Sequence, residues 1–316
     1  MAKGLITVFG GAGFIGRHLI RRLAKQGWII RVATRQPSAA TFLKPLGDVG
    51  QITPIRVPLD DPAALQAALG GARAVVNLVG ILYEKGDRNF DAVHVRGAQA
   101  VAAAAAQAGA ERLIHISAIG ADPRSESDYA RSKGAGEAAV KAAFAKATIL
   151  RPSVVFGPED DFFNRFAAMA CLSPVLPLIG GGATKFQPVY VGDVAEAIVA
   201  CLGKPASGGK TYELGGPQSY SFKDLMEIVM AQIGRRRLLV PLPFALADIQ
   251  AAFLEKLPVP PLTRDQVRML RRDNVVAKGA LGLADLGIVP AAVESVVPTY
   301  MDRYRKGGRF NQTVTQ

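Results

Sequence analysis

Glycines near the start of the chain are spaced in a way that suits contact with phosphate. Residues 8–17 are Val-Phe-Gly-Gly-Ala-Gly-Phe-Ile-Gly-Arg, which places Gly10, Gly13 and Gly16 three residues apart, after an apolar segment and before a helix-forming one. In a turn between a strand and a helix, the first glycine permits a tight bend, the second lets the backbone approach a pyrophosphate, and the third packs the helix against the sheet. The helix start then offers N–H groups and a partial positive charge to an anion. We therefore predict a phosphate-binding turn in which Phe14 and Ile15 contribute backbone; a tight loop without a ligand is the alternative.

The end of the next predicted strand, at residues 29–33, favours one dinucleotide over another. An NAD site places an acidic side chain here to bind the ribose 2′-hydroxyl, whereas this chain has Thr34, Arg35 and Gln36. Arg35 could bind a 2′-phosphate through two N–H groups, and Arg17 could add a second positive charge. We therefore expect NADPH as the cofactor, with NAD less favoured. The alternative is that both arginines are simply exposed.

Three further positions follow predicted strands and could line the same ligand. Asp60 could accept a hydrogen bond from the adenine amino group, or it could be a turn residue beside Asp61, which caps the next helix. Backbone at Asn77, Val79 and Gly80 could line a ribose. These residues extend the predicted site from the glycine turn to the fourth strand.

The elements that position these residues alternate in type through the first half of the chain. We predict strands at 5–9, 29–33, 52–56, 74–78, 112–116 and 148–150, and helices at 15–26, 62–69, 95–108 and 128–145. This alternation predicts an α/β fold, a Rossmann-type doubly wound parallel sheet with helices on both faces. After residue 155 glycine and proline accumulate, which indicates a smaller α+β C-terminal lobe with helices starting near Phe222 and Arg264. We assign 1–155 to the dinucleotide-binding domain, with a strand and helix at 188–203 returning to it; 156–187 and 204–308 form the smaller lobe, and 309–316 a flexible tail.

Several motifs resemble the extended and atypical short-chain dehydrogenase/reductase superfamily over residues 4–214. They are the glycine turn, Asp60, residues 77–80, Tyr129-x-x-x-Lys133, Arg151-Pro152 and residues 189–195, in the order of the superfamily. The resemblance implies that Tyr129 is the acid/base and that Lys133 holds the nicotinamide ribose and lowers the tyrosine pKa. It also adds Pro152 and Ser117 to the cofactor-binding residues.

The third catalytic group of this superfamily is a hydroxyl that orients the substrate oxygen. Its usual position here is occupied by Ala118, and Ser117 stands one place earlier, where an extended chain points its side chain to the opposite side. A missing hydrogen-bond donor of this kind lowers rates by about a hundredfold. The pair Tyr129 and Lys133 is therefore either vestigial or active, depending on whether Ser117 serves instead.

A closer resemblance is to the NADPH-binding accessory subunits of proton-pumping respiratory complex I, which occur in mitochondria and alphaproteobacteria. It rests on segments in both halves of the chain, namely residues 77–80, 151–160, 187–191 and 263–267. It implies a subunit of the electron-transport complex that holds NADPH tightly in a structural or sensing role, docked on peripheral-arm subunits. The alternatives are a soluble NADP-dependent oxidoreductase or epimerase, and a non-catalytic NADPH-sensing regulator.

Composition limits the partners. The formal net charge of +12 favours anionic partners, but the basic residues are scattered and form no nucleic-acid-binding module. Segment 238–247 is unusually apolar, residues 249–257 continue it at near-helical spacing, and arginines flank it at 235–237 and 268–272. Such a segment suits an anionic membrane surface or a large partner, or else it is a buried core helix. Two isolated cysteines indicate neither a disulfide nor a metal site. We expect neither a signal peptide nor a membrane-spanning segment, and a peripheral location on the cytoplasmic side of a bacterial inner membrane.

Overall fold

The computed structural model describes residues 3–308, which divide into two compact units. The first unit comprises the chain through Pro152, Val191–Leu214 and Lys278–Ile288; the second comprises Ser153–Tyr190, Gly215–Ala277 and the chain from Val289 onward. Segments 204–214 and 278–288, which the sequence analysis placed in the smaller lobe, thus belong with the first unit. The expected tail at 309–316 lies outside the described residues.

A seven-stranded parallel sheet forms the centre of the first unit, in the order β11-β6-β5-β4-β1-β2-β3. The order runs outward in both directions from β1, so the sheet is doubly wound, as predicted. Its strands are β1 (Leu5–Phe9), β2 (Ile29–Thr34), β3 (Ile52–Arg56), β4 (Ala72–Asn77), β5 (Arg112–Ile116), β6 (Thr148–Pro152) and β11 (Thr211–Leu214). Between β1 and β4 the direction of winding reverses, and ligands of such sheets bind at the carboxyl ends of the strands at this switch point.

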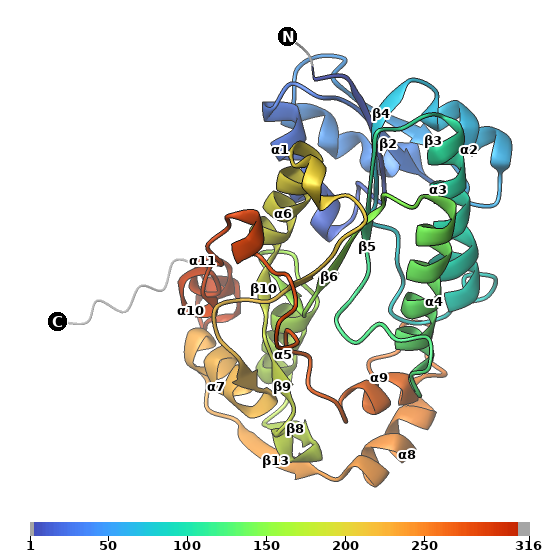
Figure 1. The fold of residues 1–316 in the computed structure, drawn as a ribbon. Helices are drawn as coiled ribbons and strands as arrows, with labels where there is room; N and C mark the ends of the chain where they lie inside the picture. Colours follow the sequence, from blue (N-terminus) through green and yellow to red (C-terminus); the bar gives the residue numbers. More distant parts are fainter. Residues whose placement is uncertain (1–2, 309–316) are drawn as a thin grey trace. The chain divides into compact units, whose positions relative to one another are not determined.

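Helices cover both faces of this sheet (Figure 1). On one face α1 (Phe14–Lys25) packs against α6 (Val191–Gly203), and on the other lie α2 (Pro62–Leu69), α3 (Gly97–Gln107) and α4 (Asp128–Ala143). A π-helix, η2 (Asp91–Arg96), leads into α3, and 3-10 helices occur at η1 (Pro37–Leu46), η4 (Pro205–Ser207) and η5 (Ala284–Leu286). Neither η1 nor η2 was predicted from the sequence.

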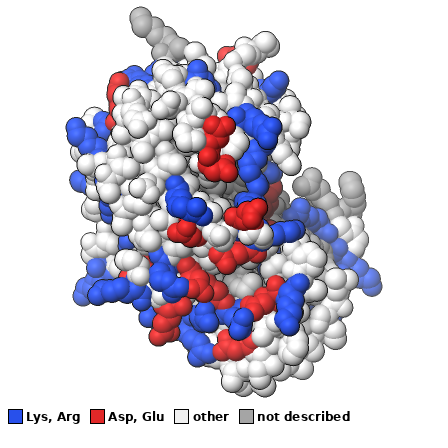
Figure 2. Space-filling model, turned by 90° about the vertical axis from the view of Figure 1, so that its right-hand side faces the viewer, with Lys and Arg blue, Asp and Glu red and all other residues white. Residues whose placement is uncertain are grey.

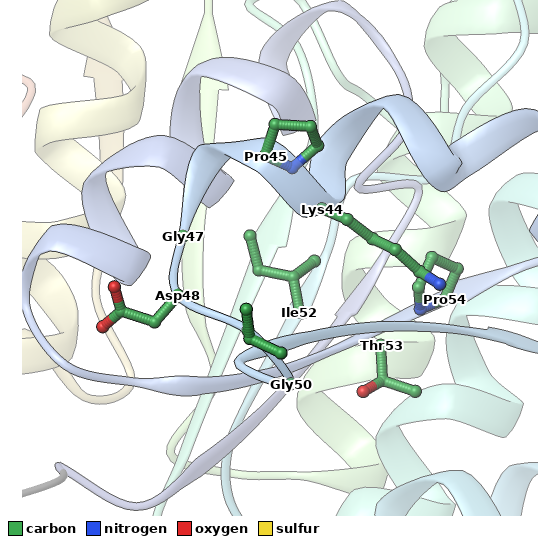
Figure 3. A pocket seen from close by; sticks show the side chains of 9 residues that line it. Lys44, Pro45, Gly47, Asp48, Gly50, Ile52, Thr53 and Pro54 are labelled. Atoms are coloured by element: carbon green, nitrogen blue, oxygen red, sulfur yellow. The ribbon is translucent and has the colours of Figure 1, made fainter.

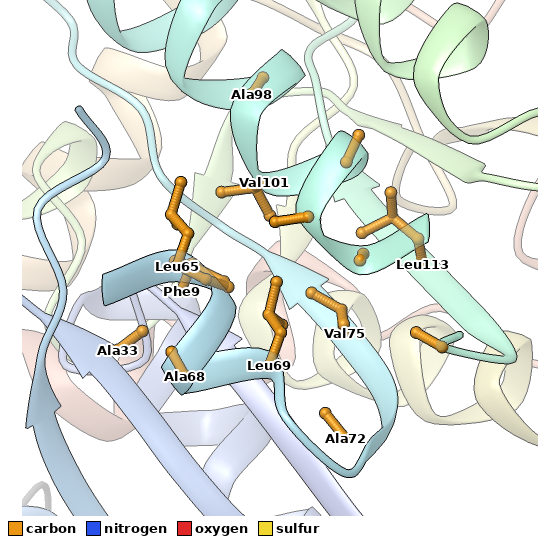
Figure 4. Close-up of a cluster of buried hydrophobic side chains, with 14 of the residues drawn as sticks. Phe9, Ala33, Leu65, Ala68, Leu69, Ala72, Val75, Ala98, Val101 and Leu113 are labelled. Atoms are coloured by element: carbon orange, nitrogen blue, oxygen red, sulfur yellow. The ribbon is translucent and has the colours of Figure 1, made fainter. Parts of the chain in front are cut away.

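The core of the first unit is built from branched and small side chains. Figure 4 shows Leu65 and Leu69 of α2 beside Phe9 of β1, with Val75 of β4 and Val101 of α3 close by. The alanines of α3 let that helix approach the sheet closely, because a methyl group fills little space. At the start of α2, the Asp61 side chain accepts a hydrogen bond from the Ala64 N–H (3.0 Å), which confirms the predicted cap.

The second unit consists of three small sheets and short helices. Its strands pair as β7 (Val155–Phe156) with β10 (Val189–Tyr190), β9 (Lys185–Phe186) with β12 (Tyr220–Ser221), and β8 (Val175–Ile179) with β13 (Leu238–Leu242). Its helices are α5 (Phe162–Leu172), η3 (Gly180–Gly182), α7 (Phe222–Ile233), α8 (Phe244–Leu254), α9 (Arg264–Met269), α10 (Val293–Val296), α11 (Pro298–Met301) and η6 (Asp302–Tyr304). α7 and α9 begin at the residues predicted from the sequence, and each begins with a capping box. The strand expected to return to the main sheet near residue 189 instead pairs with β7, because β11 occupies the edge beside β6.

Candidate cofactor-binding site

The glycine turn joins β1 to α1 at the switch point of the sheet. Gly10 has a φ of 75°, a conformation that L side chains rarely adopt, and a Cβ there would lie 3.1 Å from the backbone carbon of Leu78, just after β4. A Cβ on Gly16 would overlap the carbonyl group of Gly11, so only glycine lets α1 start this close to the turn. Gly10 thus permits the predicted bend, and Gly16 permits the close packing of α1 on the turn.

The first turn of α1 is open to an anion. Gly13 is the N-cap in an extended conformation without a side chain to cap the helix, and no acidic residue stands in the first turn. Phe14 and Ile15 are the first helical residues, so their backbone N–H groups lack acceptors within the helix. Free amide donors together with the helix dipole suit a pyrophosphate group. The backbone here fits the cofactor that the fold implies.

Arginine side chains occur at the end of β2 and beside η1. Arg35 is exposed directly after β2, and the Arg17 guanidinium lies 5.3 Å from the ring centre of Phe42 in η1. Burial lowers the pKa of Arg88, and the positive charge of Arg35 lowers it further, so these two side chains are within electrostatic reach of each other. Arg88 was not predicted from the sequence, because nothing in its spacing relates the loop after β4 to β2. Clustered positive charge suits a doubly charged phosphate.

Residues after β3 and β4 contribute mainly backbone. Asp60 is exposed in the turn before α2. Asn77 is buried, and its Oδ1 accepts a hydrogen bond from the Val79 N–H at 3.1 Å, which shapes the chain as it leaves β4. Gly80 follows and is exposed. Asn77 therefore acts on its own backbone, while Val79 and Gly80 present theirs beside the glycine turn.

Tyr129 and Lys133 lie in the first turns of α4, which the Ser127 side chain caps through the Ala130 N–H. The buried Lys133 donates a hydrogen bond from Nζ to the Ile116 carbonyl oxygen at 2.8 Å, and burial lowers its pKa to about 8, although Glu137 acts in the opposite direction. Burial raises the pKa of Tyr129 to about 12. The family rule makes the lysine lower the tyrosine pKa, whereas in this structure burial of the phenol dominates.

Hydroxyl groups near the end of β5 differ from the superfamily pattern. Ser117 is 3% exposed, and its Oγ has no hydrogen-bond partner among residues 3–308. Its N–H donates to the Leu150 carbonyl oxygen on β6 at 2.7 Å. A buried hydroxyl without a partner is costly unless a ligand or water satisfies it. Ser117 is therefore the available hydroxyl, while Ala118 occupies the usual position. Pro152, at the end of β6, accepts a hydrogen bond from the Ile119 N–H at 3.0 Å and fixes this segment from the other side.

A hollow at the edge of the sheet is separate from these residues (Figure 3). It is lined by residues 44–54, from η1 to the start of the edge strand β3, with Lys44 and Asp48 as its charged side chains. None of the glycine turn, Tyr129 or Lys133 contributes to it. It is not the candidate site.

The second unit exposes an apolar stripe on α8. Ala247 and Ala251 are buried on one side of this helix, whereas Leu246, Ile249 and Phe253 are 54%, 59% and 70% exposed. This exposed stripe decides against the buried core helix that the sequence left open. Residues 235–272, which include α8, contain eight basic and three acidic residues. Figure 2 shows charges of both signs mixed over one face, with uncharged areas between them.

No helix within residues 3–308 is long and apolar enough to cross a membrane.

The doubly wound sheet and the glycine turn at its switch point define a Rossmann-type dinucleotide-binding protein. The model of the NAD dependent epimerase/dehydratase family matches residues 6–215, and the chain belongs to this family. Members bind a nicotinamide dinucleotide. One example is the dTDP-glucose 4,6-dehydratase DesIV from Streptomyces venezuelae, solved with NAD bound. That structure superimposes with a TM-score of 0.71 at 19% identity, covering 95% of this chain and 96% of the other, a likeness of fold alone.

Two relatives are more similar in sequence. The NADH dehydrogenase (ubiquinone) 1 alpha subcomplex subunit 9, mitochondrial, of Arabidopsis thaliana is 39% identical over 323 residues, covering 98% of this chain and 80% of the relative. The ceramide reductase of Caulobacter vibrioides is 33% identical over 242 residues, covering 77% of this chain and 74% of the relative. The first similarity includes both units of the structure.

Proposed function

We propose that the protein is an accessory subunit of proton-pumping NADH:ubiquinone oxidoreductase, docked on the peripheral arm, which binds NADPH in a structural or sensing role. The observation that carries this proposal is the extent of similarity to the Arabidopsis subunit, 98% of the chain, including the second unit with its own core and capped helices. A resemblance confined to the dinucleotide fold would stop near Leu214.

NADPH rather than NADH is the proposed cofactor because of the charge around Arg35. Arg35 takes the place of the acidic residue of NAD sites, and Arg88 lies within electrostatic reach. Without a bound anion these two cations repel each other, so a 2′-phosphate would both pair with them and relieve that repulsion. The pyrophosphate would lie on the first turn of α1.

Little or no turnover is proposed from the surroundings of Tyr129. A phenol with a pKa of about 12 is a poor base at neutral pH, and the hydroxyl that should orient a substrate is replaced by Ala118. Lys133 is held by the Ile116 carbonyl and can still contact a ribose. These residues suit retention of a cofactor better than its oxidation.

Native purification tests the proposal directly. Membranes of the source cell are solubilised with a mild detergent and separated by size, and the protein is detected beside NADH oxidation activity. We expect comigration with a large NADH-oxidising assembly and release of NADPH on denaturation. Recovery only as a free monomer would overturn the subunit assignment, and release of NADH alone would overturn the cofactor assignment.

A free NADP-dependent reductase is the second candidate. It is favoured by the similarity to ceramide reductase and by the presence of Tyr129 and Lys133 on one face of α4. The purified protein is incubated with NADPH and a ceramide that carries a ketone group, and absorbance at the nicotinamide band is followed. Sustained oxidation that Tyr129→Phe abolishes would favour this candidate.

The α8 stripe is proposed to rest on an anionic membrane surface, on the cytoplasmic face of a bacterial inner membrane. Apolar side chains that stand out of a helix with Arg264 and Arg271 beside it suit phospholipid headgroups and the outer part of the acyl layer. Flotation with vesicles tests this. We expect binding to phosphatidylcholine vesicles that contain phosphatidylglycerol, and loss of binding in Phe253→Ser.

Two results would contradict the membrane proposal. Val289, which is 90% exposed elsewhere on the second unit, provides the matched control Val289→Ser, which should bind vesicles like the wild type. Equal loss in both variants would rule out a specific contact through α8, and equal binding to vesicles without phosphatidylglycerol would rule out the anionic surface.

A further inference from the structure

His94 lies buried in the π-helix that joins β4 to α3. It is 2% exposed. π-helices are rare, and many occur at functional sites. A Cβ on Gly136 of α4 would overlap the His94 carbonyl oxygen, so the π-helix and α4 are in close contact at this glycine.

Hydrogen bonds connect the imidazole of His94 to two parts of the cofactor site. The Ile81 N–H donates to Nε2 at 3.0 Å, and Nδ1 lies 2.9 Å from Ser132 Oγ. Ser132 Oγ donates to the Tyr129 carbonyl oxygen at 2.7 Å, so it accepts the proton of Nδ1. Every donor and acceptor in this series of hydrogen bonds is therefore assigned, with the imidazole neutral and its proton on Nδ1.

The charge state of His94 is stable. Burial lowers the pKa of His94 to about 3, and the positive charge of Lys133 lowers it further. The Ile81 N–H occupies Nε2, the nitrogen that would take up the additional proton. A neutral ring is required at every pH at which both bonds persist, because a protonated Nε2 could not accept from Ile81. The connection is therefore independent of pH across the physiological range.

Aromatic packing fixes the ring of His94 in place. Phe90 stacks on it with ring centres 5.4 Å apart, and the Tyr129 ring meets it edge-on at 5.5 Å. The imidazole is thus held between the chain after β4 and the residue that the superfamily uses as acid/base.

We propose that His94 is a positioning residue for the nicotinamide half of the cofactor, because it ties the backbone at Gly80 and Ile81 to the first turn of α4. It sets the separation between the chain after β4 and the pair Tyr129 and Lys133. The inference rests on the proposed binding of NADPH. His94 is not expected to affect binding of the adenosine half of the cofactor, which is proposed to contact the glycine turn and Arg35.

Calorimetric titration of the full chain with NADPH and with 2′,5′-ADP, which lacks the nicotinamide half, tests this inference. In His94→Leu we expect about a tenfold loss of NADPH affinity, as for one or two lost hydrogen bonds, and less than a twofold change for 2′,5′-ADP. His115→Leu is the matched control, since His115 is an equally buried imidazole whose Nδ1 has no partner among residues 3–308. It should leave both affinities unchanged.

Smaller changes keep the test decisive if His94→Leu folds poorly. Ser132→Ala removes the middle hydroxyl of these hydrogen bonds and should weaken the binding of NADPH, but not that of 2′,5′-ADP, by several-fold. His94→Gln keeps a donor and an acceptor, so it should restore part of the NADPH affinity and part of the fluorescence of bound NADPH. An unchanged NADPH affinity in both His94→Leu and Ser132→Ala overturns the inference. Equal losses of affinity for NADPH and 2′,5′-ADP in these variants also overturn it. A wild-type protein that binds neither ligand overturns the proposed function itself.

Discussion

The phosphate-binding turn and the region around Tyr129 lie in the same unit but are built on different principles. The turn consists of backbone: three glycines, a helix start and the chain after β4, whose positions follow from steric limits. The Tyr129 region consists of side chains whose properties depend on burial and on neighbours from η2 and β5. A motif thus specifies the backbone geometry of the first region, whereas in the second region the family spacing leaves the chemistry undetermined.

Gly16→Ala should give the largest effect, because the added Cβ collides with the Gly11 carbonyl group. We expect a loss of about 3 kcal/mol in the free energy of unfolding and no measurable NADPH binding. Urea unfolding and titration measure the two quantities. Gly13→Ala is the graded comparison, since its Cβ would lie 3.2 Å from the Gly10 oxygen and the chain need shift only slightly. Equal behaviour of the two variants would contradict a backbone-defined turn.

Lys133 should produce a pH dependence that the glycine turn lacks. Its pKa is about 8 in the folded protein against 10.5 ordinarily, so between these values the unfolded chain holds more protons than the folded one. Stability from this group therefore rises as pH increases from about 8 to 10.5, by about 2–3 kcal/mol. Lys133→Met should remove that rise from urea unfolding curves recorded across this range. If the free energy of unfolding depended on pH in the same way in the wild type and in Lys133→Met, burial of the Lys133 charge would not destabilise the folded protein.

Arg35→Ala should separate the two cofactors. Loss of a charge-assisted pair with the 2′-phosphate should lower NADPH affinity by about ten- to a hundredfold, while NADH affinity stays within about twofold. Titration with both nucleotides measures the ratio. Equal weakening of both would place Arg35 on the pyrophosphate or the adenine instead.

Tyr129→Phe should have the smallest effect. If the phenol serves packing against His94 and Phe90, NADPH affinity should change by less than about threefold, because the ring is retained. Binding and thermal unfolding of the variant check this. A large loss of NADPH binding would indicate a direct contact between the hydroxyl and the cofactor. The Tyr129 region would then contribute to cofactor binding, as is proposed for the glycine turn.

Sequence alone was sufficient for the doubly wound sheet, the capped start of α2 and the capping boxes of α7 and α9, because each depends on local pattern. The strand β11 was missed, since four residues far along the chain carry no signal for pairing with β6. His94 and Arg88 were missed for a related reason: their roles arise from contacts with Ile81, Ser132 and Arg35 that only the folded chain brings together. The exposure of α8 could not be inferred, because an apolar helix has the same composition whether it faces a core or a membrane.

The position of β11 late in the sequence has a consequence for expression of the protein in parts. Residues 191–214 and 278–288 complete the first unit, although the second unit's segments are interleaved with them. A fragment truncated after Pro152 would leave β6 as an open edge and α1 without α6. Such an edge invites pairing with other chains. Neither unit is complete until residues 278–301 have been synthesised, so the two units must be expressed together in one chain.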